Sequence, residues 1–313
     1  MRRKVIQIAQ STQLISLPRK WALAHDIKKG DELNISEEGN KLVVSTETGP
    51  HIGKVEVDIT GLDRDSIMYL LRALYKNGYD DMTIRFKKPL CENIRAKKQE
   101  KVTDVITREI SRLNGVEIFS QKEDYCVIRS ISEDTIKAFD TMLRRIFLLT
   151  SETFSELIEG YEKGNLNILE TVQAKHDTIT KLVSYSQRLL NKVGYQNYKK
   201  TDIIYHVLEI IDTILDLAKY NARGIINFKI KASPEGTQIC RAIHQQFDLF
   251  YDLYYNFTLE KVYELNKNRY FVIKNLEQNQ NKIQKNELSI LANMEQVLEY
   301  ILNLTNARIA LQY

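Results

Sequence analysis

Residues 14–31 read LISLPRKWALAHDIKKGD, and their turn and helix-start residues indicate how the N-terminal part of the chain folds. Pro18 supplies the fixed φ of a first helical turn, and Gly30 provides a turn after the short helix. We expect short strands on both sides of that helix, at 5–8 and 14–17 and then at 31–36 and 41–45. A segment this short has too little chain for a core of its own without metal or disulfide, so it is expected to pair with a second copy.

The overall composition is that of a globular protein. The chain has 313 residues, of which 43% are hydrophobic and 27% charged, which argues against a disordered or membrane-spanning chain. Its length predicts at least two cores. The net charge of +4 is too small for the whole molecule to coat nucleic acid, so charge has to be considered segment by segment.

The number of cysteines and the hydropathy of the chain together indicate the cellular compartment of the protein. Cys91, Cys126 and Cys240 are scattered and odd in number, which supports neither a disulfide framework nor a zinc site. No stretch approaches the roughly 20 apolar residues needed to cross a bilayer. We therefore expect a soluble cytoplasmic protein without membrane insertion.

The fold class expected is α+β multidomain, with an N-terminal β domain over 1–48. Residues 53–131 combine alternating strands such as 55–59 and 82–86 with two stretches of helical spacing. They predict a small α/β sandwich in the order βαβαββ, which carries no motif and is interpreted as a spacer or sensory domain.

From residue 132 onward the apolar spacing is helical. No glycine or proline follows Gly236, and Ser233 with Pro234 forms an N-cap and first turn. Breaks are expected near 256–258 and 275–286, because one unbroken helix would be too long for a domain. Residues 132–313 therefore predict an antiparallel bundle of about six helices in two three-helix halves, 132–228 and 233–313.

The N-terminal motifs point to a family. Ser16-Leu17-Pro18-Arg19, the amphipathic helix 21–26 and the turn Lys28-Lys29-Gly30-Asp31 follow one another in a short span. Over residues 2–47 the chain resembles the AbrB/MazE/SpoVT swapped-hairpin DNA-binding domain. The resemblance implies an intertwined homodimer whose first strand and loop approach double-stranded DNA.

The resemblance to that family implies which side chains of this chain approach DNA. Cations neutralise phosphates, and Gln or Arg can also contact base edges. An ordinary solvated face is the alternative, since residues 1–50 hold eight Lys and Arg against six Asp and Glu. The candidates carried over are Arg2, Arg3, Lys4, Gln10, Gln13, Arg19 and Lys20.

The helical region carries a second resemblance. Residues 294–306 resemble the ExxxD signature helix of PhoU-type phosphate-uptake regulators, and 264–269 resemble its companion motif. The resemblance implies binding of divalent or ferric metal, because carboxylates at i and i+4 share one helix face. The candidate ligands are Glu264, Asn268, Glu295 and Glu299, with Asp177, Glu209 and Asp212 in the first half.

A solvated acidic face is the alternative to metal. Gln173 and Thr213 stand where the family pattern has carboxylates. On a helical wheel Asp202, Glu209, Asp212 and Asp216 share a side, as the acids of any surface helix do.

No catalytic constellation is evident. The five histidines share no ligand spacing and are interpreted as isolated surface or core residues. Phosphate loops and nucleophile elbows are absent from the sequence. We expect no enzyme activity; a catalytic metal held by Glu264, Glu295 and Glu299 is the least favoured interpretation.

The two resemblances together predict a homodimeric DNA-binding transcriptional regulator of phosphate uptake and phosphate homeostasis. In this hypothesis the PhoU-like domain receives the signal through metal, through phosphate transporter components or through a sensor kinase. The alternative is a PhoU-type adaptor that regulates a phosphate transporter or kinase by protein contact, in which the N-terminal domain serves only for dimerisation.

Overall fold

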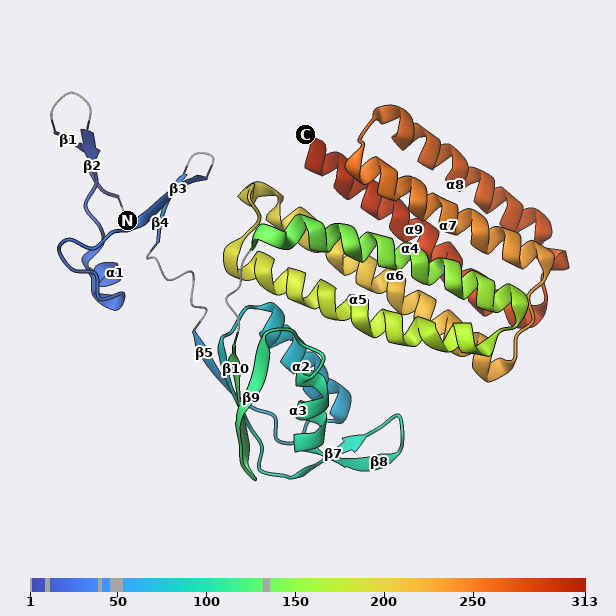
Figure 1. The fold of residues 1–313 in the computed structure, drawn as a ribbon, viewed down its shortest axis with the longest axis horizontal. Coiled ribbons are helices and arrows are strands. Elements are labelled where there is room, and N and C mark those ends of the chain that lie inside the picture. The colour runs from blue at the N-terminus through green and yellow to red at the C-terminus, as the bar shows by residue number, and fades with distance from the viewer. Residues whose placement is uncertain (1, 9–11, 39–40, 46–52, 132–135) are drawn as a thin grey trace. The chain divides into compact units, whose positions relative to one another are not determined.

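The computed structural model describes residues 2–8, 12–38, 41–45, 53–131 and 136–313. The chain forms two compact units, Met1–His51 and Ile52–Tyr313, and Figure 1 shows their elements. The α+β class is confirmed, with strands in the small N-terminal unit and several helices in the C-terminal region. Among the described helices, none has the length and apolar character needed to cross a membrane.

The N-terminal unit consists of two hairpins joined by a short helix. Its elements are β1 (Ile6–Ile8), β2 (Thr12–Leu14), α1 (Arg19–Ala24), β3 (Asn34–Glu38) and β4 (Lys41–Ser45). Both hairpins are antiparallel, and Ile6 faces Leu14 in the first. The strand expected over 14–17 is paired only up to Leu14, because β1 provides no partner beyond Ile6.

Residues 14–31 provide most of the connection between the two hairpins. The Pro18 carbonyl accepts the Ala22 N–H at 3.0 Å and so closes the first turn of α1. Gly30 has a φ of +99°, a left-handed conformation that favours glycine. The Asp31 carboxylate accepts the Lys28 N–H at 2.6 Å across that turn. The turn and cap residues therefore act as the sequence predicted.

The second unit begins with an α/β layer. Its elements are β5 (Lys54–Asp58), α2 (Arg64–Lys76), β6 (Asp81–Arg85), β7 (Leu90–Asn93), β8 (Lys98–Lys101), α3 (Val102–Ile110), β9 (Val116–Gln121) and β10 (Tyr125–Ser130). Strands β5, β6, β10 and β9 form one sheet in that order, in which only β5 and β6 are parallel. Helices α2 and α3 pack on one face of the sheet and enclose a core that includes Ile67, Met82, Ile106 and Ile128.

The β7–β8 hairpin is an addition to the predicted order. Strand β8 has only charged and polar residues, and β7 has two adjacent apolar ones, Leu90 and Cys91, so neither strand shows the alternating apolar pattern that predicts a strand. Side-chain pairing stabilises it instead: the Asn93 amide donates to Glu100 at 2.8 Å. The Val102 N–H bonds to the Pro89 carbonyl at 3.0 Å and closes its base.

Long helices form the rest of the described chain. They are α4 (Phe139–Lys163), α5 (Leu166–Val193), α6 (Thr201–Phe228), α7 (Pro234–Tyr255), α8 (Leu259–Asn279) and α9 (Leu288–Gln312), with short 3-10 turns at Ile136–Ala138, Tyr198–Lys200, Gln280–Lys282 and Lys285–Glu287. Both expected breaks occur, after Tyr255 and after Asn279. Ser233 caps α7 by accepting the Gly236 N–H at 3.0 Å.

These helices share one continuous apolar core. Helix α4 packs between α5 and α7, while α9 packs on α6 and α7; α8 lies along α7 (Figure 1). The predicted start of this region at Ser132 and the predicted end of the first domain at residue 48 lie outside the described residues. The division into three domains therefore stays a prediction.

Arg188 joins the α/β layer to the helices. This side chain of α5 is fully buried, and its guanidinium donates to the carbonyls of Tyr75 and Tyr79 at 3.1 and 2.9 Å. It also pairs with the Asp80 carboxylate at 2.8 Å. Because the donors of a guanidinium are fixed in one plane, these contacts set the position of α5 against the end of α2.

Replacing Arg188 should therefore loosen this junction. We expect Arg188→Leu to lower the free energy of unfolding by roughly 3 kcal/mol, because it leaves buried carbonyls and a carboxylate without this donor. Arg145→Leu on α4 is the matched control, since Arg145 is exposed. Denaturant unfolding measures both; an equal, small loss in the two variants contradicts the assigned role.

Candidate functional site

Within the N-terminal unit, the side chains that the structure describes are not buried by the unit itself. No described side chain between Arg2 and Val44 is buried. Large apolar side chains of both hairpins and α1 face solvent instead; they are Val5, Ile6, Ile8, Leu14, Ile15, Leu23, Ile35, Leu42 and Val43. The unit therefore has an apolar surface of the kind that marks an interaction site.

The predicted DNA-binding cations are free within this unit. Arg2, Arg3, Lys4, Arg19 and Lys20 are all exposed, and none makes an ion pair or hydrogen bond with another described residue. Lys28 differs, because its ammonium pairs with Asp26 at 2.9 Å. Cations without an internal partner are available to phosphate groups.

The cations do not gather at one point of the chain. Arg2 to Lys4 precede β1, at the open end of the first hairpin, whereas Arg19 and Lys20 begin α1. Gln13 lies in β2 opposite Gln7, at the middle pair of the hairpin, and is exposed. Gln10 lies outside the described residues.

The four metal-ligand candidates predicted on α8 and α9 do not form one cluster over the described residues. Glu264 and Glu295 are exposed, and Asn268 is half-buried. Glu299 accepts from Arg269 of α8, at 3.0 Å from Nε and also from Nη2. One of the four candidates therefore faces an internal cation.

The predicted residues of the first half lie where α5 and α6 meet the α/β layer. Asp177 pairs with Arg112 at 2.6 Å. Glu209 pairs with Lys76 at 3.1 Å and accepts from the Gln187 amide at 2.6 Å. Asp212 accepts from the Thr180 hydroxyl at 2.8 Å, and burial raises the pKa of its carboxyl.

The centre of this group is a histidine that the sequence pattern did not single out. His176 of α5 is buried, with Nδ1 3.0 Å from Asp177 and Nε2 2.8 Å from Asp216 of α6. Lys219 pairs with Asp216, and its ammonium lies 3.2 Å from Nε2 of His176. The interpretation of every histidine as isolated is therefore wrong for His176, as it is for His244 of α7, whose Nε2 lies 2.9 Å from Ser151.

Two signals in the sequence bear on this cluster. His176 falls at helical spacing from Val172, Ile179 and Val183, which are all buried, so the apolar stripe of α5 already places it inside. Asp216 and Lys219 are three residues apart on one helix. Their contact with His176 comes from helix packing, which spacing alone does not predict.

The charges of the cluster balance one another. Burial lowers the pKa of His176, but its hydrogen bonds to Asp177 and Asp216 outweigh burial and leave that pKa above the ordinary value. Burial raises the pKa of Asp216, yet His176 and Lys219 bring it down to about 2. Over the described residues, no group of three His, Cys, Asp or Glu side chains is arranged to hold a metal ion. Metal binding here and at α8 and α9 stays a prediction.

A serine, a histidine and an aspartate also meet between α4 and α7. Ser151 Oγ lies 2.9 Å from Nε2 of His244 and donates to Asp248. Asp248 approaches that same nitrogen, at 3.6 Å, rather than Nδ1. A catalytic triad needs the acid on the other ring nitrogen, so this trio lacks that geometry. The expected absence of enzyme activity stays a prediction.

Comparison with known families bears on the N-terminal segment. A family model described as antidote-toxin recognition MazE, bacterial antitoxin, matches residues 6–50. This match supports the predicted MazE/AbrB resemblance over that segment, and with it a DNA-binding regulator in general terms. No curated protein matches the chain. The PhoU-like resemblance of the helical region stays a prediction.

The His176 cluster predicts a pH-dependent contribution to stability. Because the pKa of His176 is raised in the folded state, its stabilising effect is complete below the ordinary pKa of roughly 6.5 and is lost as pH rises through the folded pKa. The difference in unfolding free energy between the native chain and His176→Gln should therefore be larger at about pH 5 than at about pH 8.5.

The matched control is His206→Gln, since His206 is exposed on the neighbouring helix α6. Denaturant unfolding at the two pH values measures both variants. A gap for His176→Gln that is no larger at about pH 5 than at about pH 8.5, or that equals the gap for His206→Gln at both pH values, excludes a charged His176 in the folded protein.

Proposed function

We propose that the chain is a homodimeric transcriptional regulator that binds double-stranded DNA through its N-terminal unit. The observation that carries this proposal is the exposed apolar surface of both hairpins in a unit that buries no described side chain. A second copy of the same unit has the matching apolar surface and the same short strands, so two interlaced copies bury it.

Dimerisation also doubles the cationic surface. Each copy contributes five exposed cations without an internal partner among the described residues, Arg2, Arg3, Lys4, Arg19 and Lys20. Cations of this kind supply most of the affinity of a protein for duplex DNA. Gln13 is placed on the first hairpin, where its amide can contact base edges.

The finer proposal concerns the signal. We infer that the helical region receives phosphate status, directly through metal or through a phosphate transporter component or sensor kinase. The PhoU-like carboxylate spacing of Glu295 and Glu299 on α9, together with three long helices before Ser233 and three after it among the described residues, supports this proposal. The adaptor function remains the second candidate, favoured by exposed Tyr263, Tyr270 and Phe271 on α8.

Salt-dependent DNA binding tests the proposal. We expect the native chain to shift duplex DNA from upstream of its own coding sequence, and the Arg19→Ala, Lys20→Ala double variant to bind at least about tenfold more weakly. The slope of log affinity against log salt should fall by roughly one for each phosphate that the variant no longer neutralises. Gel-shift titration at several salt concentrations measures both quantities.

The matched control removes two neighbouring cations from another part of the chain, as Lys199→Ala with Lys200→Ala in the 3-10 turn that precedes α6. This variant should keep the native affinity and slope. If the native chain ignores DNA at low salt, or if the two double variants behave alike, DNA binding by the N-terminal unit is excluded and the adaptor becomes the better proposal.

A further inference from the structure

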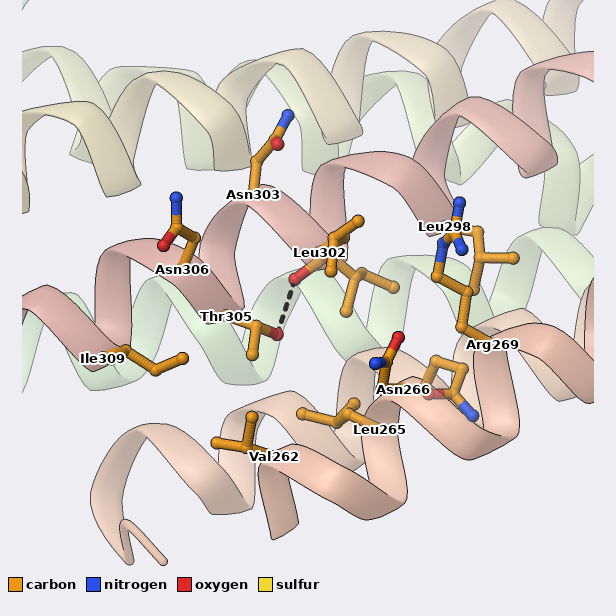
Figure 2. A pocket seen from close by; sticks show the side chains of 12 residues that line it. Val262, Leu265, Asn266, Arg269, Leu298, Leu302, Asn303, Thr305, Asn306 and Ile309 are labelled. Atoms are coloured by element: carbon orange, nitrogen blue, oxygen red, sulfur yellow. Dashed lines mark hydrogen bonds between the residues drawn. The ribbon is translucent and has the colours of Figure 1, made fainter. Parts of the chain in front are cut away.

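A cavity of about 360 Å³ lies between α7, α8 and α9. Figure 2 shows side chains of α8, including Val262 and Leu265, facing side chains of α9 such as Leu298 and Ile309 across it. The cavity exists because α8 packs along α7 and touches α9 much less. Its size falls within the range of roughly 300–1,000 Å³ of small-molecule sites.

Most of the wall is apolar. Only Leu265 and Val272 of α8 are buried, so this helix contributes little else to the core. An apolar wall of this size accommodates a ring system or short chain of a ligand. The apolar lining residues are Val262, Leu265, Leu298, Ile301, Leu302 and Ile309.

The side chain of Gln246, a largely buried residue, lines the same cavity. Gln246 of α7 is only 5% exposed, and its side-chain amide makes no hydrogen bond with any residue that the structure describes. Thr305, in contrast, donates to the Ile301 carbonyl at 2.8 Å (Figure 2). An amide that has no protein partner and lines a cavity is free to bond to a ligand there, so Gln246 offers one donor pair and one acceptor to an occupant of the cavity.

The lining has no free charge. Arg269 is its one charged residue among those described, and that guanidinium is already paired with Glu299. Asn266, Asn303 and Asn306 at the edge are neutral amides. A charged ligand would lose its hydration on entry without gaining a counter-charge, whereas a neutral one would not.

We propose that this cavity binds an uncharged small molecule with an apolar body and a carboxamide-like head group that pairs with Gln246. The head group needs both a donor and an acceptor, because the Gln246 amide presents both. In the proposed regulator, this position places a small-molecule site within the helical signal-receiving region. The binding itself does not depend on DNA binding.

Equilibrium dialysis of the full chain tests the site with three probes that share one apolar body. They are 1-naphthaleneacetamide, 1-naphthaleneacetate and 1-naphthylmethylammonium, whose heads are neutral, anionic and cationic. We expect one saturable site per chain for the amide and affinities at least about tenfold weaker for both ions. No saturable binding of the amide, which is the result if only water occupies the cavity, or equal binding of the three probes, overturns the proposal.

Two variants locate the binding. Leu302→Trp should fill the cavity and abolish binding; Leu302 is 39% exposed, so the larger ring can be accommodated without unfolding. Gln246→Leu should weaken the binding of 1-naphthaleneacetamide about tenfold. It should also remove the preference of the cavity for this neutral probe over the two charged probes. Leu148→Trp on α4, where Leu148 is 51% exposed and outside the lining, is the matched control and should bind as the native chain does.

Circular dichroism and thermal unfolding confirm that each variant is folded before dialysis. Unchanged binding in folded Leu302→Trp places the probe elsewhere and overturns the assignment. Because no DNA is present, a failure here leaves the proposed DNA binding untouched, and a failure of DNA binding leaves this site untouched.

Discussion

In the N-terminal unit, none of the described residues covers the apolar side chains of the two hairpins, and the proposed dimer rests on this constraint. Its two hairpins are joined by a helix of six residues, and no described side chain between Arg2 and Val44 is buried. Hydrophobic burial is the main favourable contribution to folding, so strands this short need a further apolar surface to be stable. A second copy supplies it in the proposed dimer, which also brings two sets of unpaired cations together.

The second unit is under no such constraint. It has one apolar core between the sheet and helices α2 and α3, and another among the long helices. Arg188 and Asp80 join the two cores, and the ion pairs of Lys76 with Glu209 and of Arg112 with Asp177 follow the same boundary. A change in the position of the long helices would therefore distort or break these ion pairs with the α/β layer.

Local signals predicted much of the fold. Pro18, Gly30 and the Ser233–Pro234 cap act where the sequence placed them, because caps and turns depend on neighbouring residues. The β7–β8 hairpin was missed because side-chain pairing, rather than apolar alternation, stabilises it. The cluster around His176 was missed for a related reason: Arg112, Asp177 and Asp216 are distant in sequence and meet only when helices pack. The predicted acidic face of α6 is thus partly an ion-paired boundary rather than a solvated surface.

The most direct test of the central claim is sedimentation equilibrium of the full chain over a wide dilution range. We expect the mass of two chains for the native protein, and the mass of one chain for a variant with Ile35→Glu and Leu42→Glu, which places charge on the exposed apolar surface. A native protein with the mass of one chain, and with β3 and β4 amides still protected from hydrogen exchange, would exclude the proposed dimer.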